Sequence, residues 1–206
     1  PAPLLFTELA ARALNHGVDG FTTQGLAMTL YAFAKARHRS SPLFSAIAPV
    51  MQARLTEATP QAITMTLWAF TAAREPAPLL VDTALREATA RMDQFRPREI
   101  STVSWAIGQQ RRRGEAVKAF FDRLAELLIV RTRDSSLTPF EMAILSSALL
   151  RAADVTFPPR VGIRPAEVAA LARAIRDGAT GTDALHCEAG DAVAASALTR
   201  LGTMNG

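Results

Sequence analysis

Apolar residues recur at helical spacing along most of this chain. In residues 22–37, Leu26, Leu30 and Phe33 are separated by four and then three positions, which places them on one face of a helix. A second apolar face lies beside the first and consists of Ala27, Tyr31 and Ala34. A helix that is apolar around most of its circumference is expected to be buried between neighbouring elements.

This pattern returns at a fixed distance. Residues 59–74 repeat residues 22–37 after 37 positions, and residues 96–111 repeat them after a further 37. A degenerate copy at residues 138–151 is offset by 42 positions. The aromatic or apolar matches include Tyr31 with Trp68 and Trp105, and Phe33 with Phe70 and Ile107. Self-similarity at one period in this range predicts a solenoid of stacked repeats.

Each repeat is predicted to contain two helices. Helix A covers the repeated segment, and an amphipathic helix B follows a short turn. The helices B are expected over residues 41–58, 77–94 and 114–133, and Pro49 is expected to kink or shorten the first of them. Residues 1–17 match helix B, so the sequence begins within a repeat. Either another helix precedes it, or this helix B caps the array.

The sequence therefore predicts an all-α protein, a right-handed-type α-solenoid of helix–turn–helix repeats with a period of 37 residues. The array is expected over residues 1–151, with a half repeat at 1–20. Full repeats begin near residues 21, 58 and 95, and the degenerate one begins near 137. Residues 152–206 are expected to form a linker, one or two C-terminal capping helices near 164–177 and 191–201, and a loose tail.

Composition narrows the functional classes. No apolar run approaches the roughly 18 residues that a membrane-spanning helix needs, so no span is expected. The 23 basic and 19 acidic residues give a net charge of +4, a mild basic bias that is compatible with nucleic acid. A single cysteine, Cys187, excludes an internal disulfide. The sequence begins at Pro1, so any targeting peptide before it cannot be read.

The most cationic segment surrounds the turn between the two helices of the third repeat. Arg111, Arg112 and Arg113 stand together there. Arginine binds phosphate in a bidentate geometry and gives affinity for RNA that does not depend on sequence. The alternatives are a solvated turn or contact with an acidic protein.

The polar stripe of the A helices supplies further candidates. Gln24, Gln61 and Arg98 are spaced by 37 and could bind bases or phosphates, or could satisfy unpaired donors at helix N-termini. The other polar members of the stripe are Lys35, Gln109 and Arg151. The aromatic residues Tyr31, Trp68 and Trp105 could stack on bases, but their place in an apolar stripe favours packing between repeats.

Nothing in the sequence predicts catalysis. There is no phosphate-binding glycine loop, nucleophile elbow or carboxylate pair at diagnostic spacing. His186 and Cys187 lack the further ligands of a zinc site. We therefore expect no catalytic residue, metal, cofactor or small-molecule substrate.

The segment PQAITMTLWAF at residues 60–70 resembles the octotricopeptide repeat and its relative, the heptatricopeptide repeat. The resemblance covers roughly residues 3–151. It implies an α-solenoid that binds organelle RNA and affects transcript maturation, stability or translation. Some family members are ribosomal proteins that hold pieces of rRNA together. It also implies an organelle as the location, and we prefer the mitochondrion to the plastid.

One position departs from the family. Helix A of the family commonly has asparagine where this chain has Met28, Met65, Thr102 and Ile144. Met28, Met65 and Ile144 cannot bond a base edge through their side chains and are suited to protein contact. We therefore expect a structural subunit of a mitochondrial ribosome, with rRNA and neighbouring proteins as partners. The alternatives are a protein-only scaffold in a respiratory or photosynthetic complex and a transcript-specific factor, which the small repeat number disfavours.

Overall fold

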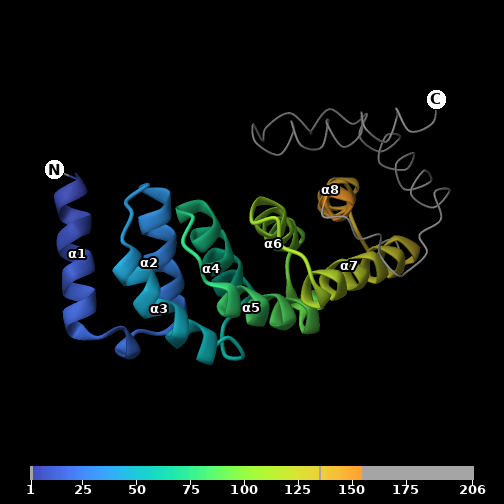
Figure 1. Cartoon of the computed structure of the whole chain (residues 1–206). Coiled ribbons are helices and arrows are strands. Elements are labelled where there is room, and N and C mark those ends of the chain that lie inside the picture. Colours follow the sequence, from blue (N-terminus) through green and yellow to red (C-terminus); the bar gives the residue numbers. More distant parts are fainter. Residues whose placement is uncertain (1, 135, 155–206) are drawn as a thin grey trace. The chain divides into compact units, whose positions relative to one another are not determined.

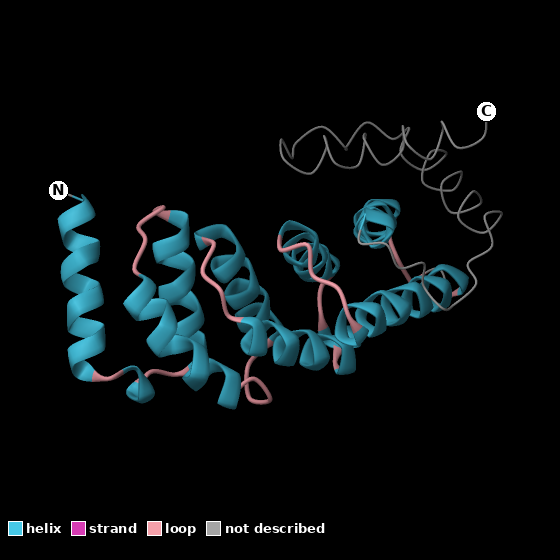
Figure 2. Cartoon of the chain, in the orientation of Figure 1, coloured by secondary structure: helices cyan, strands magenta, loops and turns pink. Residues whose placement is uncertain are grey.

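A computed structural model describes residues 2–134 and 136–154, and within them it contains α-helices and two short 3₁₀ helices but no strand (Figures 1 and 2). The predicted all-α class is therefore confirmed for this part of the chain. The chain divides into two compact units, Pro1–Phe95 and Arg96–Gly206. Their boundary lies at the start of the third predicted repeat. The expected C-terminal helices near 164–177 and 191–201, together with His186 and Cys187, lie outside the described residues.

The described helices follow the predicted segments to within a few residues. Unit 1 holds α1 (Ala2–His16), η1 (Val18–Gly20), α2 (Thr23–Lys35), α3 (Ser41–Ala53), α4 (Pro60–Ala73), α5 (Pro78–Ala90) and η2 (Met92–Gln94). The described part of unit 2 holds α6 (Pro97–Gln109), α7 (Glu115–Arg133) and α8 (Pro139–Asp154). We refer to α2, α4, α6 and α8 as the A helices and to α1, α3, α5 and α7 as the B helices.

Side-chain caps explain where the first two A helices begin. The Thr22 hydroxyl accepts a hydrogen bond from the Gly25 N–H, and the Thr59 hydroxyl accepts one from the Ala62 N–H, both at 3.1 Å. Such caps satisfy one of the backbone donors that a helix N-terminus leaves unpaired. Pro60 then occupies the first turn of α4, where a missing N–H costs nothing.

The last described A helix begins with a reciprocal capping box. The Glu141 carboxylate accepts hydrogen bonds from the Thr138 N–H at 3.0 Å and the Thr138 hydroxyl at 2.8 Å. In return, the Glu141 N–H donates to the Thr138 hydroxyl oxygen at 3.3 Å. The backbone bond from Thr138, the hydroxyl bond and the charge of Arg131 together lower the pKa of Glu141.

This capping box predicts a pH-dependent contribution to stability. Because the pKa of Glu141 is lowered in the folded protein, its contribution is complete above the unfolded pKa and is lost as the pH falls through the folded pKa. We expect E141Q to unfold about 1–2 °C lower than the parent at pH 7, reflecting a loss near 0.5 kcal/mol. Thermal melts of both proteins over a pH series from 7 into the acid range would test this. A difference between the two melting temperatures that stays constant across the series would contradict it.

Pro49, which was expected to kink or shorten its helix, lies inside α3. Helix α3 continues through Pro49 to Ala53. The matching helix α5 has Arg86 at the corresponding position and ends at Ala90, which is 37 residues after Ala53. Because helices with and without the proline end at the same place, Pro49 does not determine the end of α3.

Unit 1 is built by pairing helices of the same kind. Helix α2 packs against α4, while α3 packs against both α1 and α5. Each A helix of the unit also meets a phenylalanine of a B helix edge-on. The Phe33 and Phe6 ring centroids are 5.0 Å apart, and those of Phe70 and Phe44 are 5.1 Å apart. These T-shaped contacts add to the burial of large apolar side chains.

Helix α4 is buried on nearly every face, yet it carries several threonines. The hydroxyls of Thr64, Thr66 and Thr71 are buried and donate to the backbone carbonyl four residues earlier, at 2.7–2.8 Å. Each of these hydroxyls therefore has a hydrogen-bond acceptor within its own helix. The helix can be enclosed on both sides despite its polar atoms.

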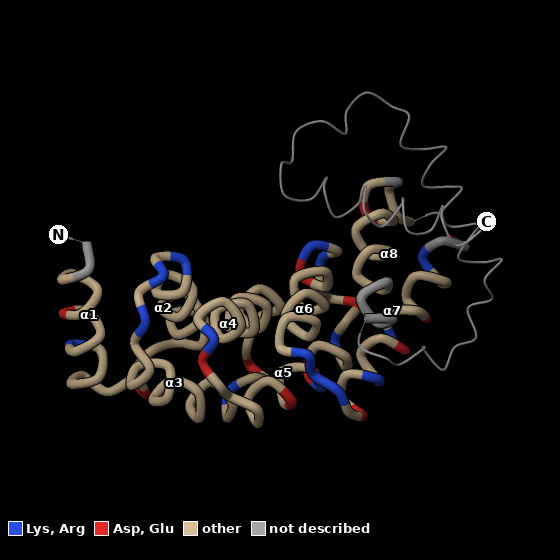
Figure 3. Tube along the Cα trace, turned by 45° about the horizontal axis from the view of Figure 1, so that its top comes forward, with Lys and Arg blue, Asp and Glu red and all other residues tan. Residues whose placement is uncertain are grey.

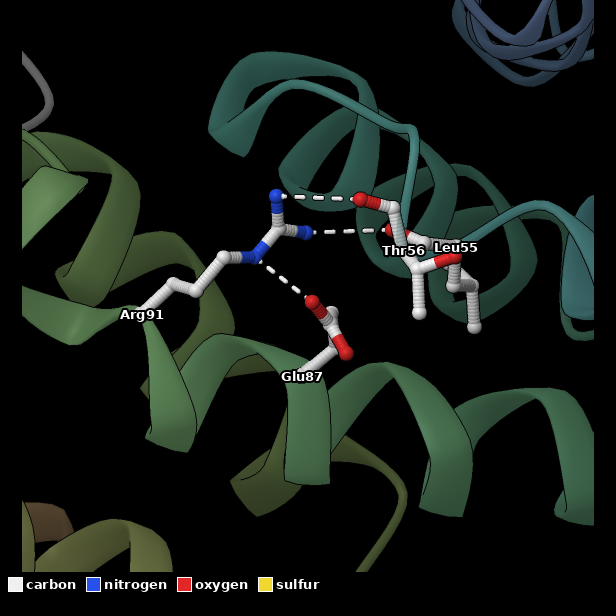
Figure 4. A network of polar contacts seen from close by, with 4 residues as sticks. All are labelled: Leu55, Thr56, Glu87 and Arg91. Carbon is white, nitrogen blue, oxygen red and sulfur yellow. Dashed lines mark hydrogen bonds and ion pairs between the residues drawn. The ribbon is translucent and has the colours of Figure 1, made fainter.

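Two arginines at the ends of B helices bind backbone carbonyls of the preceding segment. The Arg54 guanidinium donates to the Phe21 carbonyl at 3.0 Å and to the Asp19 carbonyl at 2.9 Å. Arg91, 37 residues later, donates to the Leu55 carbonyl at 3.0 Å and to the Thr56 carbonyl at 3.5 Å (Figure 4). We call Arg54 and Arg91 the bracket arginines.

Unit 2 uses the same kinds of contact among its described helices. Helix α8 packs against both α6 and α7. The side chains of Ile100, Val103, Phe120, Phe121 and Leu145 are buried in this unit. This core fixes the end of α6 and the start of α7, and therefore the turn that connects them.

Candidate nucleic-acid interface

The α6–α7 turn presents the arginine cluster that the sequence singled out. Figure 3 shows a run of basic positions along this connection. Arg111 and Arg113 are exposed, and Arg112 is half-buried. The turn thus directs at least two guanidinium groups into solvent, two residues apart in the chain. Such a group can bind a phosphate in a bidentate geometry.

A specific backbone motif shapes the start of this turn. Arg111 has a φ of 49°, in the left-handed region. Its N–H donates to the Gly108 carbonyl at 3.0 Å, and the Arg112 N–H donates to the Ile107 carbonyl at 3.2 Å. This pair of bonds is the Schellman motif, which satisfies the last carbonyls of a helix. Gly114, with a φ of 118°, then allows the sharp entry into α7.

The same helix end occurs twice in unit 1. Arg37 and Arg74 have φ values of 54° and 58°. Their N–H groups donate to the Ala34 and Thr71 carbonyls at 3.0 and 3.2 Å, and each following residue bonds back to the A-helix phenylalanine at 3.0 Å. Sequence reasoning did not select Arg37 or Arg74 as site residues. The signal that could have found them is their spacing, because Arg37, Arg74 and Arg111 are 37 residues apart.

The row of Gln24, Gln61 and Arg98 does not behave as one set. The Gln24 side-chain oxygen accepts a long hydrogen bond from the Thr59 hydroxyl, at 3.4 Å, next to the start of α4. Gln61 is exposed. The Arg98 guanidinium lies 5.6 Å from the ring centroid of Phe140, within cation–π range. Gln24 therefore contacts the residue that caps α4 and not an unpaired backbone N–H, whereas Gln61 is exposed.

The rest of the polar stripe is exposed where it is described. Lys35 and Gln109 each lie at the end of an A helix with an exposed side chain. Arg151 lies in α8, and its side chain is outside the described part of the structure. Lys35 is two residues before Arg37, so the end of α2 presents two cations (Figure 3).

The candidate protein-contact residues differ in exposure. Met28 is 56% exposed, whereas Met65 and Ile144 are half-buried. Thr102, at the corresponding position of α6, donates its hydroxyl to the Arg98 carbonyl at 2.9 Å. Of this row, Met28 offers the largest apolar surface to a partner.

The aromatic residues favour packing over base stacking. The rings of Tyr31 and Trp68 are tilted by 43° with their centroids 4.9 Å apart, and both side chains are half-buried. They connect α2 to α4 within unit 1. Trp105 of α6 is also half-buried. A ring that already contacts a protein ring has one face fewer for a base.

Other chemistry finds little support in the described residues. Among them, no group of three or more His, Cys, Asp or Glu side chains could hold a metal ion. None of the described helices is both long and apolar enough to cross a bilayer. Comparison of the chain with protein-family models, curated proteins and solved structures gives no significant match.

Proposed function

We propose that this protein is a non-catalytic RNA-binding or RNA-scaffolding subunit in an organelle, as a structural component of a mitochondrial ribosome that contacts rRNA. The observation that carries the proposal is the arginine cluster of the α6–α7 turn, where Arg111 and Arg113 extend into solvent. Phosphate contact by such groups gives affinity without reading bases. The resemblance of residues 60–70 to the octotricopeptide motif supports the same class.

The proposal includes a particular fold. We propose that the helices form an α-solenoid of octotricopeptide or heptatricopeptide type with a period of 37 residues. Support comes from like features 37 residues apart: the capping threonines Thr22 and Thr59, the bracket arginines, and the left-handed helix ends. Solenoids present extended surfaces to long ligands such as RNA.

Substituting the arginine cluster tests the proposed function. We expect R111Q/R112Q/R113Q to weaken binding of a single-stranded RNA and to lower the slope of log K against log salt by about 1.4–2, since each lost phosphate contact removes ~0.7. The measurement is fluorescence anisotropy across a salt titration. The matched control is R12Q/R86Q/R123Q, which removes the same charge from B helices. An unchanged slope in the cluster variant would overturn the proposal.

A protein-only scaffold remains the second candidate, because Met28 is 56% exposed on α2. In that version Met28, Met65 and Ile144 contact a partner helix in a respiratory or photosynthetic complex. Nuclease treatment of the native assembly distinguishes the two functions. A subunit held by RNA should be released, whereas a subunit held by protein should stay. Crosslinking in its own cells would separate rRNA from a single mRNA, the ligand of a transcript-specific factor.

A further inference from the structure

Three A helices are followed by the same residue type in the same unusual backbone conformation. Arg37, Arg74 and Arg111 follow α2, α4 and α6, and all have φ values between 49° and 58°. Glycine is the usual occupant of this position, because a Cβ is disfavoured in the left-handed region. Nothing in the Schellman hydrogen bonds requires a side chain, since they use backbone atoms alone. The repeated choice of arginine therefore needs another reason.

Within the described part of the structure, the three arginine side chains do not stabilise the fold through polar contacts. All three are exposed, and none makes a side-chain hydrogen bond or ion pair with another described residue. The bracket arginines, in contrast, donate to backbone carbonyls. Glu75, the acidic residue that follows Arg74, already has other partners. Glu75 accepts a hydrogen bond from the Ser41 hydroxyl at 2.7 Å and lies 4.0 Å from an Arg39 nitrogen.

We propose that Arg37 and Arg74 bind phosphates of one single-stranded RNA, with one contact for each A helix. Arg111 has the same local geometry in unit 2. The inference rests on the proposed function and extends it to unit 1. Helices that pack as α2 and α4 do have axes about 8–10 Å apart. That step corresponds to two or three nucleotides of a stacked strand, at roughly 3.4 Å each.

The exposure of these arginines favours phosphate over protein carboxylates. An isolated ion pair in solvent adds little affinity, because water and salt screen it. A nucleic-acid strand differs, because each cation that replaces a condensed counterion releases it and gains entropy. Single exposed arginines at regular intervals therefore suit a polyphosphate. Carboxylates of an acidic peptide would bind well only to arginines that are partly shielded from water, and Arg37 and Arg74 are exposed.

Glycine substitution separates binding from folding. R37G/R74G removes both guanidinium groups and places at each helix end the residue that this conformation prefers. We expect the Tm to stay the same or rise, while the slope of log K against log salt for a fluorescein-labelled polyuridine strand falls by about 1.4. At low salt this corresponds to roughly tenfold weaker binding or more. A role in folding alone would instead lower the Tm and leave the slope unchanged.

Two controls decide the remaining outcomes. R12Q/R86Q removes two exposed arginines from B helices of the same unit and should keep the slope. R37K/R74K keeps both charges and should therefore keep most of the slope of log K against log salt. The inference is overturned if R37G/R74G binds like the parent, or if polyglutamate displaces the RNA as well as unlabelled polyuridine does. If R111Q/R112Q/R113Q loses slope and R37G/R74G does not, the proposed function stands and this inference alone fails.

Discussion

R91M should lower the free energy of unfolding by about 2–3 kcal/mol and the Tm by roughly 5–10 °C. Methionine keeps the length of the side chain but removes the guanidinium. The carbonyls of Leu55 and Thr56 then lose their donors, and the Glu87 carboxylate loses its ion pair with the Arg91 Nε, 2.6 Å away (Figure 4). Arg91 and Glu87 are only 22% and 21% exposed, so water replaces these contacts poorly. Thermal denaturation followed by circular dichroism would measure the loss.

R86Q is the matched control for this prediction. Arg86 lies on α5, the helix that ends just before Arg91, and is exposed. A surface substitution of this kind should change stability by no more than about 0.5 kcal/mol. If R91M and R86Q had the same Tm, the contacts of Arg91 would contribute nothing to stability. The pairing of α3 with α5 would then depend on apolar contacts alone.

Hydrophobic spacing predicted the A helices well because the positions of apolar residues along a helix depend mainly on which face is buried. Leu26, Leu30 and Phe33 were expected on one face, and all three are buried. The threonine caps and Pro60 then set where helices begin, and these signals can also be read from the sequence. Element type and approximate bounds therefore followed from local chemistry.

The sequence could not sort the arginines. Arg54 and Arg91 donate to backbone carbonyls, which have no side-chain signature and so leave no trace in the sequence. Arg74, by contrast, is exposed and occupies a left-handed position whose usual sign is glycine. Charge alone therefore cannot tell an arginine that holds the fold from one that is available to a ligand. Backbone conformation and partner atoms make that distinction.

The row of Gln24, Gln61 and Arg98 shows a second limit of prediction from sequence. Equal spacing suggested one role for Gln24 and Arg98, but the contacts that a side chain makes depend on the residues beside it. Gln24 meets the Thr59 hydroxyl, whereas Arg98 meets the ring of Phe140. The neighbour changes from one segment to the next, so equivalent positions acquire different contacts.

F70A should have the largest effect of all, a loss of about 3–5 kcal/mol in the free energy of unfolding. Phe70 is 2% exposed and meets Phe44, which is 1% exposed, edge-on at 5.1 Å. Truncation removes the transfer energy of the ring and leaves a cavity between α4 and α3. F70I should lose less, because the chain itself places Ile107 at the corresponding position of α6. Chemical denaturation of the parent and both variants would rank them.

F70A also separates stability from RNA binding. The Phe70 carbonyl accepts the Glu75 N–H at 3.0 Å, a backbone bond that alanine can still form, so the left-handed Arg74 should persist while the protein is folded. Below its reduced Tm, F70A should therefore keep the salt slope of RNA binding that R37G/R74G loses. A folded F70A that had lost the slope would mean that the core, and not the exposed guanidinium groups, controls contact with the strand.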